Sequence, residues 1–328
     1  MTYKGDKLGA FIVPTGVGAS IGGYAGDASS YAREFSKYSK LIVNPNVVNA
    51  GCFSGITSNM LYVEGYALDS FFKNQINLIT SYNNKIGIIY DKAIPKDVLN
   101  IHINTQNAVK TVYGIEISDY VITEENVGVD FFVTKEGIST GGINNITTIH
   151  NAAQKLINNG CEAIAIVCLF KDSESENENY SNGIGVDPVG GIEAVISHYI
   201  SKNFNVACAH SPAFEDYQIY PEIVNPKSSA EYITPTFLPC ILIGLSQAPK
   251  ISTDLNIGIN VKNLDYLVMP YNCLGSTPVI QAIKYGIKVY AIKENKTELN
   301  ITKANLPESQ NIIEISTYNE ALDIIRSN

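Results

Sequence analysis

The chain of 328 residues has no long apolar run. A membrane-spanning helix needs roughly 18 consecutive apolar residues or more, whereas the most hydrophobic stretch, residues 237–245, is about half that length and contains Pro239. Residues 1–6 also lack the apolar core of a secretory signal. We therefore expect a cytoplasmic protein with no membrane partner.

Positive charge is also scarce. The chain has 23 Lys and Arg against 32 Asp and Glu, which gives a formal net charge of -9. Nucleic acids and anionic membranes both favour basic surfaces, so the composition argues against a nucleic-acid partner. A small molecule is the expected partner, and a homo-oligomer is left open.

Cysteines are few and are not paired in sequence. Six are present, with no Cys-x-x-Cys pair. Disulfide frameworks and zinc ribbons depend on such spacing, so neither is expected and no metal site is predicted. Cys52 and Cys273 lie in Gly-containing loops after strand-like segments. This leaves a cofactor-free racemase with two cysteines as an alternative.

Apolar runs of strand length alternate with helix-like segments along the whole chain. Several are continuous and rich in Ile and Val, as in strands buried on both faces of a parallel sheet. The alternation predicts an α/β fold of strand–loop–helix units with Gly-rich loops, in mostly parallel sheets with helices on both faces. The expected strands are residues 8–13, 41–43, 86–90, 115–122, 163–169, 206–209, 266–269, 288–292 and 312–315.

Polar stretches near the middle suggest a division into two lobes. Residues 124–126 and 137–145 are polar, which separates an N-terminal α/β lobe, 1–135, from a C-terminal α/β lobe, 136–328. The length also allows one large domain.

The most informative stretch is residues 13–27, which holds five glycines together with Thr15 and Ser20. It joins a strand to a helix, where unpaired backbone N–H groups favour an anion. Its order Gly16-x-Gly18-x-x-x-Gly22 misses the dinucleotide spacing by one residue, and Asn44 ends the next strand where that motif needs an acid. A typical NAD-dependent dehydrogenase is therefore not expected, and no other cofactor is predicted.

Two further Gly-rich loops follow strands. The second loop, residues 183–191, contains Asp187, and the third, residues 271–278, places Ser276 and Thr277 before a proline. At the carboxyl ends of parallel strands, three such loops would meet in one crevice, where open α/β sheets bind ligands. The acidic run 171–179, before the second loop, fits either a solvated loop or a lid.

A few side chains are candidates for acid–base chemistry. His210 is the histidine expected at a strand's carboxyl end, and imidazole suits proton transfer near neutral pH. Asp187 and Glu193 bracket the glycines of the second loop, where a carboxylate could act as acid, base or metal ligand, or where Asp187 could cap a helix. Glu64 lies in an apolar segment and needs a partner if it is buried.

Several segments resemble a known family. They are VPTGVGASIGGYAGDA at 13–28, NPNVVNA at 44–50, LYVEGY at 61–66, GIGVDPVGGIEAVISH at 183–198, CAHSP at 208–212 and FLPC at 237–240. These are similar to the DUF3326 family, a conserved domain of unknown function found in cyanobacteria and plants. The resemblance spans nearly the whole chain and implies no activity that can be transferred to it.

We predict an enzyme that acts on a small anionic metabolite, a carboxylate or a phosphate, by acid–base chemistry. His210 would transfer protons, with Asp187 or Glu64 as its partner. Lyase, isomerase and hydrolase chemistry all fit, and the alternative is a non-catalytic binding or regulatory protein that uses the same crevice. The expected ligand-binding residues are Thr15, Gly16, Ser20, Gly22, Gly23, Asn44, Gly190, Gly191, Ser276 and Thr277.

Overall fold

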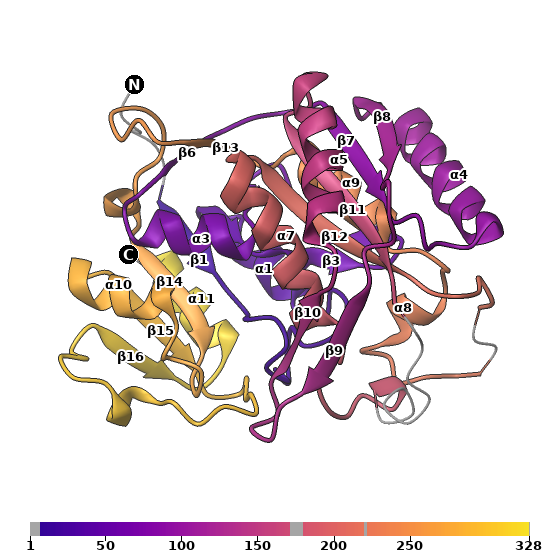
Figure 1. The fold of residues 1–328 in the computed structure, drawn as a ribbon. Helices are drawn as coiled ribbons and strands as arrows, with labels where there is room; N and C mark the ends of the chain where they lie inside the picture. Colours follow the sequence, from indigo (N-terminus) through magenta and orange to yellow (C-terminus); the bar gives the residue numbers. More distant parts are fainter. Residues whose placement is uncertain (1–6, 171–179, 220–221, 328) are drawn as a thin grey trace.

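The computed structural model describes residues 7–170, 180–219 and 222–327. It contains two parallel sheets with helices around them (Figure 1). The six-stranded sheet has the order β16-β15-β14-β1-β2-β5, and the four-stranded sheet has the order β12-β11-β7-β8. The expected α/β class is confirmed. The expected lid, residues 171–179, lies outside the described residues.

The predicted strands correspond closely to those of the two parallel sheets. The six-stranded sheet consists of β1 (Leu8–Phe11), β2 (Lys40–Val43), β5 (Met60–Tyr62), β14 (Tyr266–Pro270), β15 (Lys288–Ile292) and β16 (Ile312–Ile315). The four-stranded sheet consists of β7 (Ile86–Tyr90), β8 (Ile117–Ile122), β11 (Ala163–Leu169) and β12 (Ala207–Ala213). Antiparallel pairs are formed by β3 (Asn49–Ala50) with β4 (Phe53–Ser54), β6 (Asn77–Ile79) with β13 (Lys250–Ser252), and β9 (Val129–Val133) with β10 (Ser139–Ile143).

Helices connect most of these strands. They are α1 (Ser29–Phe35), α2 (Pro45–Val48), α3 (Gly65–Phe72), α4 (Lys96–Tyr113), α5 (Ile146–Asn158), α7 (Gly190–Phe204), α8 (Ser229–Tyr232), α9 (Leu238–Ser246), α10 (Thr277–Tyr285) and α11 (Tyr318–Ser327). No helix in these described parts of the chain is both long and apolar enough to cross a bilayer.

The two sheets do not follow the expected division at residue 135. The six-stranded sheet takes strands from both ends of the chain, and the four-stranded sheet is made from the middle. Residue 135 lies in the turn between β9 and β10, which pair with each other. A boundary at residue 135 would therefore fall inside the β9–β10 hairpin.

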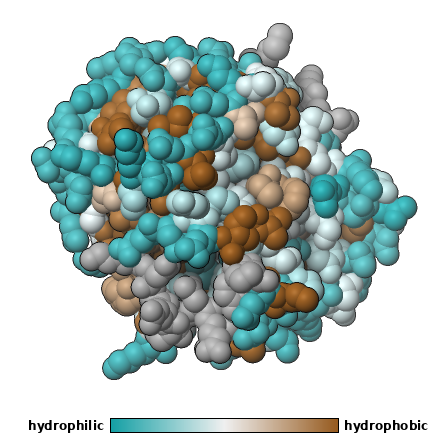
Figure 2. Space-filling view, turned by 90° about the vertical axis from the view of Figure 1, so that its right-hand side faces the viewer, coloured by the Kyte–Doolittle hydropathy of each residue, from teal (hydrophilic) through white to brown (hydrophobic). Residues whose placement is uncertain are grey.

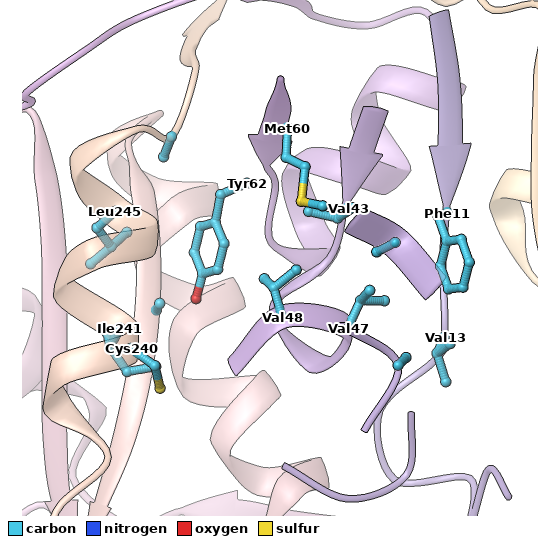
Figure 3. Packing of buried hydrophobic residues seen from close by; sticks show 14 of the residues in the cluster. Phe11, Val13, Val43, Val47, Val48, Met60, Tyr62, Cys240, Ile241 and Leu245 are labelled. Atoms are coloured by element: carbon cyan, nitrogen blue, oxygen red, sulfur yellow. The ribbon is translucent and has the colours of Figure 1, made fainter. Parts of the chain in front are cut away.

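A shared apolar core joins the two sheets. One cluster of buried residues includes Phe11 and Tyr62 from the first sheet, Ile88 from the second, and Ile241 and Leu245 from α9. Figure 3 shows α9 facing Tyr62 and the neighbouring α2. Because α9 also packs on β11 and β12, it links the sheets through apolar contact.

The outer faces of the sheets are covered as well. Helices α3 and α10 pack on the far face of the six-stranded sheet, and α5 and α7 pack on that of the four-stranded sheet. In Figure 1, α5 and α7 lie in front of the four-stranded sheet. The face at the right of Figure 1 is mainly hydrophilic, and its apolar residues form separate patches (Figure 2).

The order of the six-stranded sheet creates a switch point. From β1 the chain continues through β2 to β5 on one side, while β14, on the other side, continues to β15 and β16. The loops after β1 and β14 therefore diverge to opposite sides, and ligands of open α/β sheets bind in the crevice between such loops.

Candidate functional site

A cavity of about 800 Å³ lies at this switch point. Its lining includes Thr15 and Gly23 from the first loop, Asp187 and Gly190 from the second, and Ser276 from the third. The three Gly-rich loops thus meet at one cavity, whose size is typical of a small-molecule site. The other predicted residues that line it are Asn44, Glu64 and His210.

The remaining predicted ligand-binding residues, Gly16, Ser20, Gly22, Gly191 and Thr277, do not contribute to the cavity lining. The reason is clear at Gly191, whose N–H donates to Ser139 Oγ at 3.0 Å. A Cβ at Gly191 would lie 2.0 Å from the Ser139 carbonyl oxygen. This glycine is needed where β10 approaches the start of α7, a packing role that the sequence did not indicate.

The N–H groups of the first loop are largely occupied by the protein's own acceptors. Gly22 and Tyr24 donate to Asp27 Oδ1 at 2.8 and 3.2 Å. Ala25 donates to Glu231 Oε1 at 3.0 Å. These N–H groups are therefore occupied by two of the protein's own carboxyl groups, which differs from the expected role of binding an external ligand.

Asn44 also has an internal role. Its side-chain amide donates to the Val13 carbonyl at 2.7 Å, and its Oδ1 accepts from the Val13 N–H at 3.1 Å. The residue that replaces the acid of dinucleotide sites thus fastens the end of β1 to the end of β2.

His210 lies within β12, not at its end. The strand continues through Pro212 to Ala213, because β12 is an edge strand and proline is tolerated where no neighbour needs its N–H. The ring points to the cavity, and burial, with a contribution from nearby His198, lowers the pKa of His210 to about 3. His210 is therefore neutral at pH 7.

The hydrogen bonds around His210 indicate its tautomer. Ser197 Oγ lies 3.0 Å from Nδ1 and also donates to a helix carbonyl, that of Glu193 or Ala194. A hydroxyl whose proton is used in this way accepts from Nδ1–H. The unprotonated Nε2 then faces Glu193 Oε2, which lies 3.9 Å away.

Glu193 is the partner of His210, in place of the expected Asp187 or Glu64. Position 193 is in the first turn of α7, which places its side chain beside β12, whereas Asp187 precedes the helix. Glu193 is 6% exposed, and its Oε1 has no hydrogen-bond partner among the described residues. Burial, followed by the charges of Asp187 and Glu231, raises its pKa well above the usual value.

Glu64 and Asp187 both accept hydrogen bonds from backbone N–H groups at helix starts. The two Glu64 oxygens accept from the N–H groups of Tyr66 and Ala67 at 2.8 and 2.6 Å, so the residue caps α3. Burial nevertheless raises the pKa of Glu64 to about 7. Its Oε2 lies 3.8 Å from His198 Nε2. Asp187 Oδ1 accepts from the Val189 N–H at 3.0 Å, just before α7, whose N-cap residue is Val189 and not Asp187.

A further carboxyl group, that of Glu231, also lines the cavity. Its Oε1 accepts from the Tyr180 hydroxyl at 3.0 Å, and burial together with the charge of Asp187 raises its pKa to about 8. The cavity is therefore rich in acids, and no Lys or Arg of the described chain contributes to its lining.

The two-cysteine alternative does not fit this cavity. Neither Cys52 nor Cys273 lines it. Cys273 is 2% exposed, and burial raises its pKa to about 12, so it is a poor proton acceptor. Within the described residues, no group of three or more His, Cys, Asp or Glu side chains is arranged to hold a metal ion.

Sequence reasoning missed part of the site. His198, Glu231 and Tyr180 all line the cavity but were not predicted, and Glu193 was considered only beside Asp187. One signal was available in the sequence. Glu193 and Ser197 are four residues apart, so they lie on the same face of α7, and this face lines the cavity. Nothing local in the sequence places Glu231 or Tyr180 there.

Comparisons with known proteins agree with the resemblance. The family described as "Protein of unknown function (DUF3326)" matches residues 9–328. An uncharacterized lipoprotein of Synechococcus sp. is 36% identical over 301 residues, which cover 90% of this chain and 84% of that protein. No solved structure matches the chain significantly. The chain therefore belongs to the DUF3326 family of proteins of unknown function.

Proposed function

We propose that this protein is an enzyme that transfers protons on a small polar metabolite, with Glu193 and His210 as its acid–base pair. The observation that carries the proposal is the buried Glu193 carboxyl, which faces the cavity with one oxygen unpaired among the described residues. A buried polar atom without a partner is costly, so it is usually retained for a functional reason.

The two side chains supply complementary chemistry. At neutral pH the raised pKa of Glu193 keeps its proton available for a substrate atom, and Glu193 acts as the general acid. Once that proton has left, the new negative charge 3.9 Å from His210 Nε2 favours a protonated imidazole. His210 then takes a proton from the substrate, so one proton is given and one is received.

The surrounding residues keep this pair in position. Ser197 accepts from His210 Nδ1 and thereby directs Nε2 toward Glu193. Glu64 and His198 form a second carboxyl–imidazole pair, and the Glu64 pKa of about 7 suits proton exchange near neutral pH. Lyase, isomerase and hydrolase reactions all use such transfers, and the proposal includes each of them.

The alternative is a non-catalytic binding or regulatory protein. One observation favours it, because both Glu64 oxygens are used to cap α3. The similar Synechococcus protein is named an uncharacterized lipoprotein. That name also bears on location. The cytoplasm remains our prediction, and fractionation of cells that express the tagged full chain tests it against a membrane-anchored form.

The proposed enzyme is tested by untargeted turnover. Wild-type protein, His210→Ala and Glu193→Gln are each incubated with a filtered small-molecule extract of bacterial cells, and the metabolites are followed by mass spectrometry. The expected result is a metabolite that wild-type protein consumes at least about a hundredfold faster than either variant. Equal profiles for the wild type and both variants would remove the enzyme proposal and leave the binding protein.

A further inference from the structure

We propose that the cavity takes a small molecule bearing a protonated amine, whose ammonium group binds Glu193 together with Asp187 and Glu231. This inference rests on the proposed function, since it names the substrate class of the same site. It replaces the expected carboxylate or phosphate, which the acid-rich lining does not favour.

Glu193 provides the first argument. Its side chain is more than nine-tenths buried and lines the cavity, and Oε1 has no partner among the described residues. An ammonium group is a compact donor of three N–H bonds, so it can satisfy that oxygen and still reach neighbouring acceptors.

The neighbours of Glu193 provide the second argument. Asp187 and Glu231 are close enough that their charges raise the pKa of Glu193, and Asp187 does the same to Glu231. Bringing such carboxyl groups together is unfavourable unless protons or a cation neutralise them. Protons do so when the site is empty. An ammonium group would replace those of Asp187 and Glu231 and donate to Glu193 Oε1, while Glu193 keeps the proton that it needs as the general acid.

No cationic side chain of the described chain already performs this task. Lys227 is nearby, but its Nζ donates to the Ser20 carbonyl and lies 5.8 Å from the centre of the Tyr24 ring. It contributes nothing to the cavity lining. The positive charge that complements the acids must therefore come with the ligand.

An ammonium group fits better than a metal ion or an anion. The described acids and histidines do not form a group with the arrangement of a metal site. An anion would meet several carboxyl groups and no Lys or Arg, and the N–H groups of Gly22, Tyr24 and Ala25 are already used by the protein. Hydroxyl groups such as that of Ser276 remain for the rest of the ligand.

Three probes of equal carbon length test the charge preference: putrescine (a diamine), butanediol (a neutral diol) and succinate (a dicarboxylate). Each is titrated into full-length protein by calorimetry, and the shift in melting temperature is recorded in parallel. We expect putrescine to bind and to raise the melting temperature, with butanediol and succinate giving much smaller shifts. Glu231→Gln should weaken putrescine binding about tenfold or more, because a carboxylate that pairs with the ammonium group is lost.

Glu116→Gln is the matched control, since Glu116 is exposed and lies outside the cavity lining. It should leave putrescine binding unchanged. Asp187→Asn serves as a second cavity variant if Glu231→Gln fails to fold. A putrescine shift no larger than that of butanediol, a larger shift with succinate, or equal binding by Glu231→Gln and wild type would overturn the inference.

The outcomes separate this inference from the proposed function. Putrescine binding without turnover of any extract metabolite supports the amine site and removes the enzyme. Turnover that depends on Glu193 and His210, without putrescine binding, supports the enzyme and removes the amine site.

Discussion

Burial sets the charge of the residues around the cavity. An isolated glutamate is ionised at pH 7, but removal from water disfavours the charged form, and neighbouring acids disfavour it further. Glu64, Glu193 and Glu231 all have raised pKa values, with burial as the largest cause. Burial acts in the opposite direction on His102 and His210, whose pKa values are lowered. These histidines are therefore neutral at pH 7, and the buried acids around the cavity retain much of their protonated form.

These shifts predict how stability depends on pH. A glutamate whose pKa is raised in the folded protein binds more protons when folded than when unfolded. Its contribution to the free energy of unfolding is therefore lost as pH rises from its usual pKa of 4.5 to the raised pKa. For Glu231 that window ends at about pH 8. The histidines have lowered pKa values, so they destabilise the fold only below their usual value of 6.5. Above pH 6.5, of these groups only the buried acids still make the free energy of unfolding depend on pH.

We therefore expect the free energy of unfolding to fall between about pH 6.5 and pH 8, by up to about 1 kcal/mol per pH unit for each such acid. Urea unfolding followed by circular dichroism measures it. Glu231→Gln should make this fall shallower, and Glu116→Gln should not. A stability that rises with pH across this interval would show that these acids are ionised in the folded protein.

At the scale of elements, α7 contributes most to the site. It carries Glu193, Ser197 and His198, and its start is fixed by the hairpin β9–β10 through Ser139. The backbone N–H of Ser139 also donates to the Gly16 carbonyl of the first loop at 3.0 Å. The hairpin thus sets the positions of the first and second loops relative to each other.

Gly191→Ala tests this coupling. The new Cβ would lie 2.0 Å from the Ser139 carbonyl oxygen, so the backbone must shift, and we expect a loss of about 1–3 kcal/mol in the free energy of unfolding. Gly142→Ala is the control, because nothing lies within 4 Å of a Cβ there. Chemical denaturation measures both. Equal stability of the two variants would mean that the close approach of β10 to α7 does not constrain the helix.

The sequence predicted the elements whose pattern is local. Strands such as β11 and β14 are continuous apolar runs, and their burial on both faces follows from that pattern. β10, with the sequence Ser-Thr-Gly-Gly-Ile, was not predicted as a strand, because it lies in the polar stretch 137–145. Its strand conformation depends on pairing with β9 and on contact with α7, and neither is encoded in the segment itself.

The candidate site was predictable to a similar extent. The meeting of three loops follows from the carboxyl ends of strands, and His210 was proposed because it was expected at such an end. It could not be predicted that N–H groups of the first loop donate to the protein's own side chains. One of those acceptors, Glu231, is 206 residues from Ala25, and no local pattern reports such a distant contact.

At the scale of the whole molecule, charge and architecture favour the same kind of ligand. The chain has a formal net charge of -9, and the cavity at the sheet's switch point is itself lined by acids. A field of this sign repels anions and attracts cations. The apolar core that α9 shares with both sheets holds the loops of the two sheets against one another, so the site is preorganised.

The central claim is that His210 is neutral beside a buried Glu193, and NMR titration of the histidine side chains tests it most directly. Nitrogen-labelled protein is titrated from pH 8 to the acid limit of the fold, and His210 is assigned with the His210→Asn variant. The account predicts a neutral ring protonated at Nδ1 throughout, because its pKa is lowered to about 3. An imidazole that becomes protonated near its usual pKa of 6.5 would contradict the account.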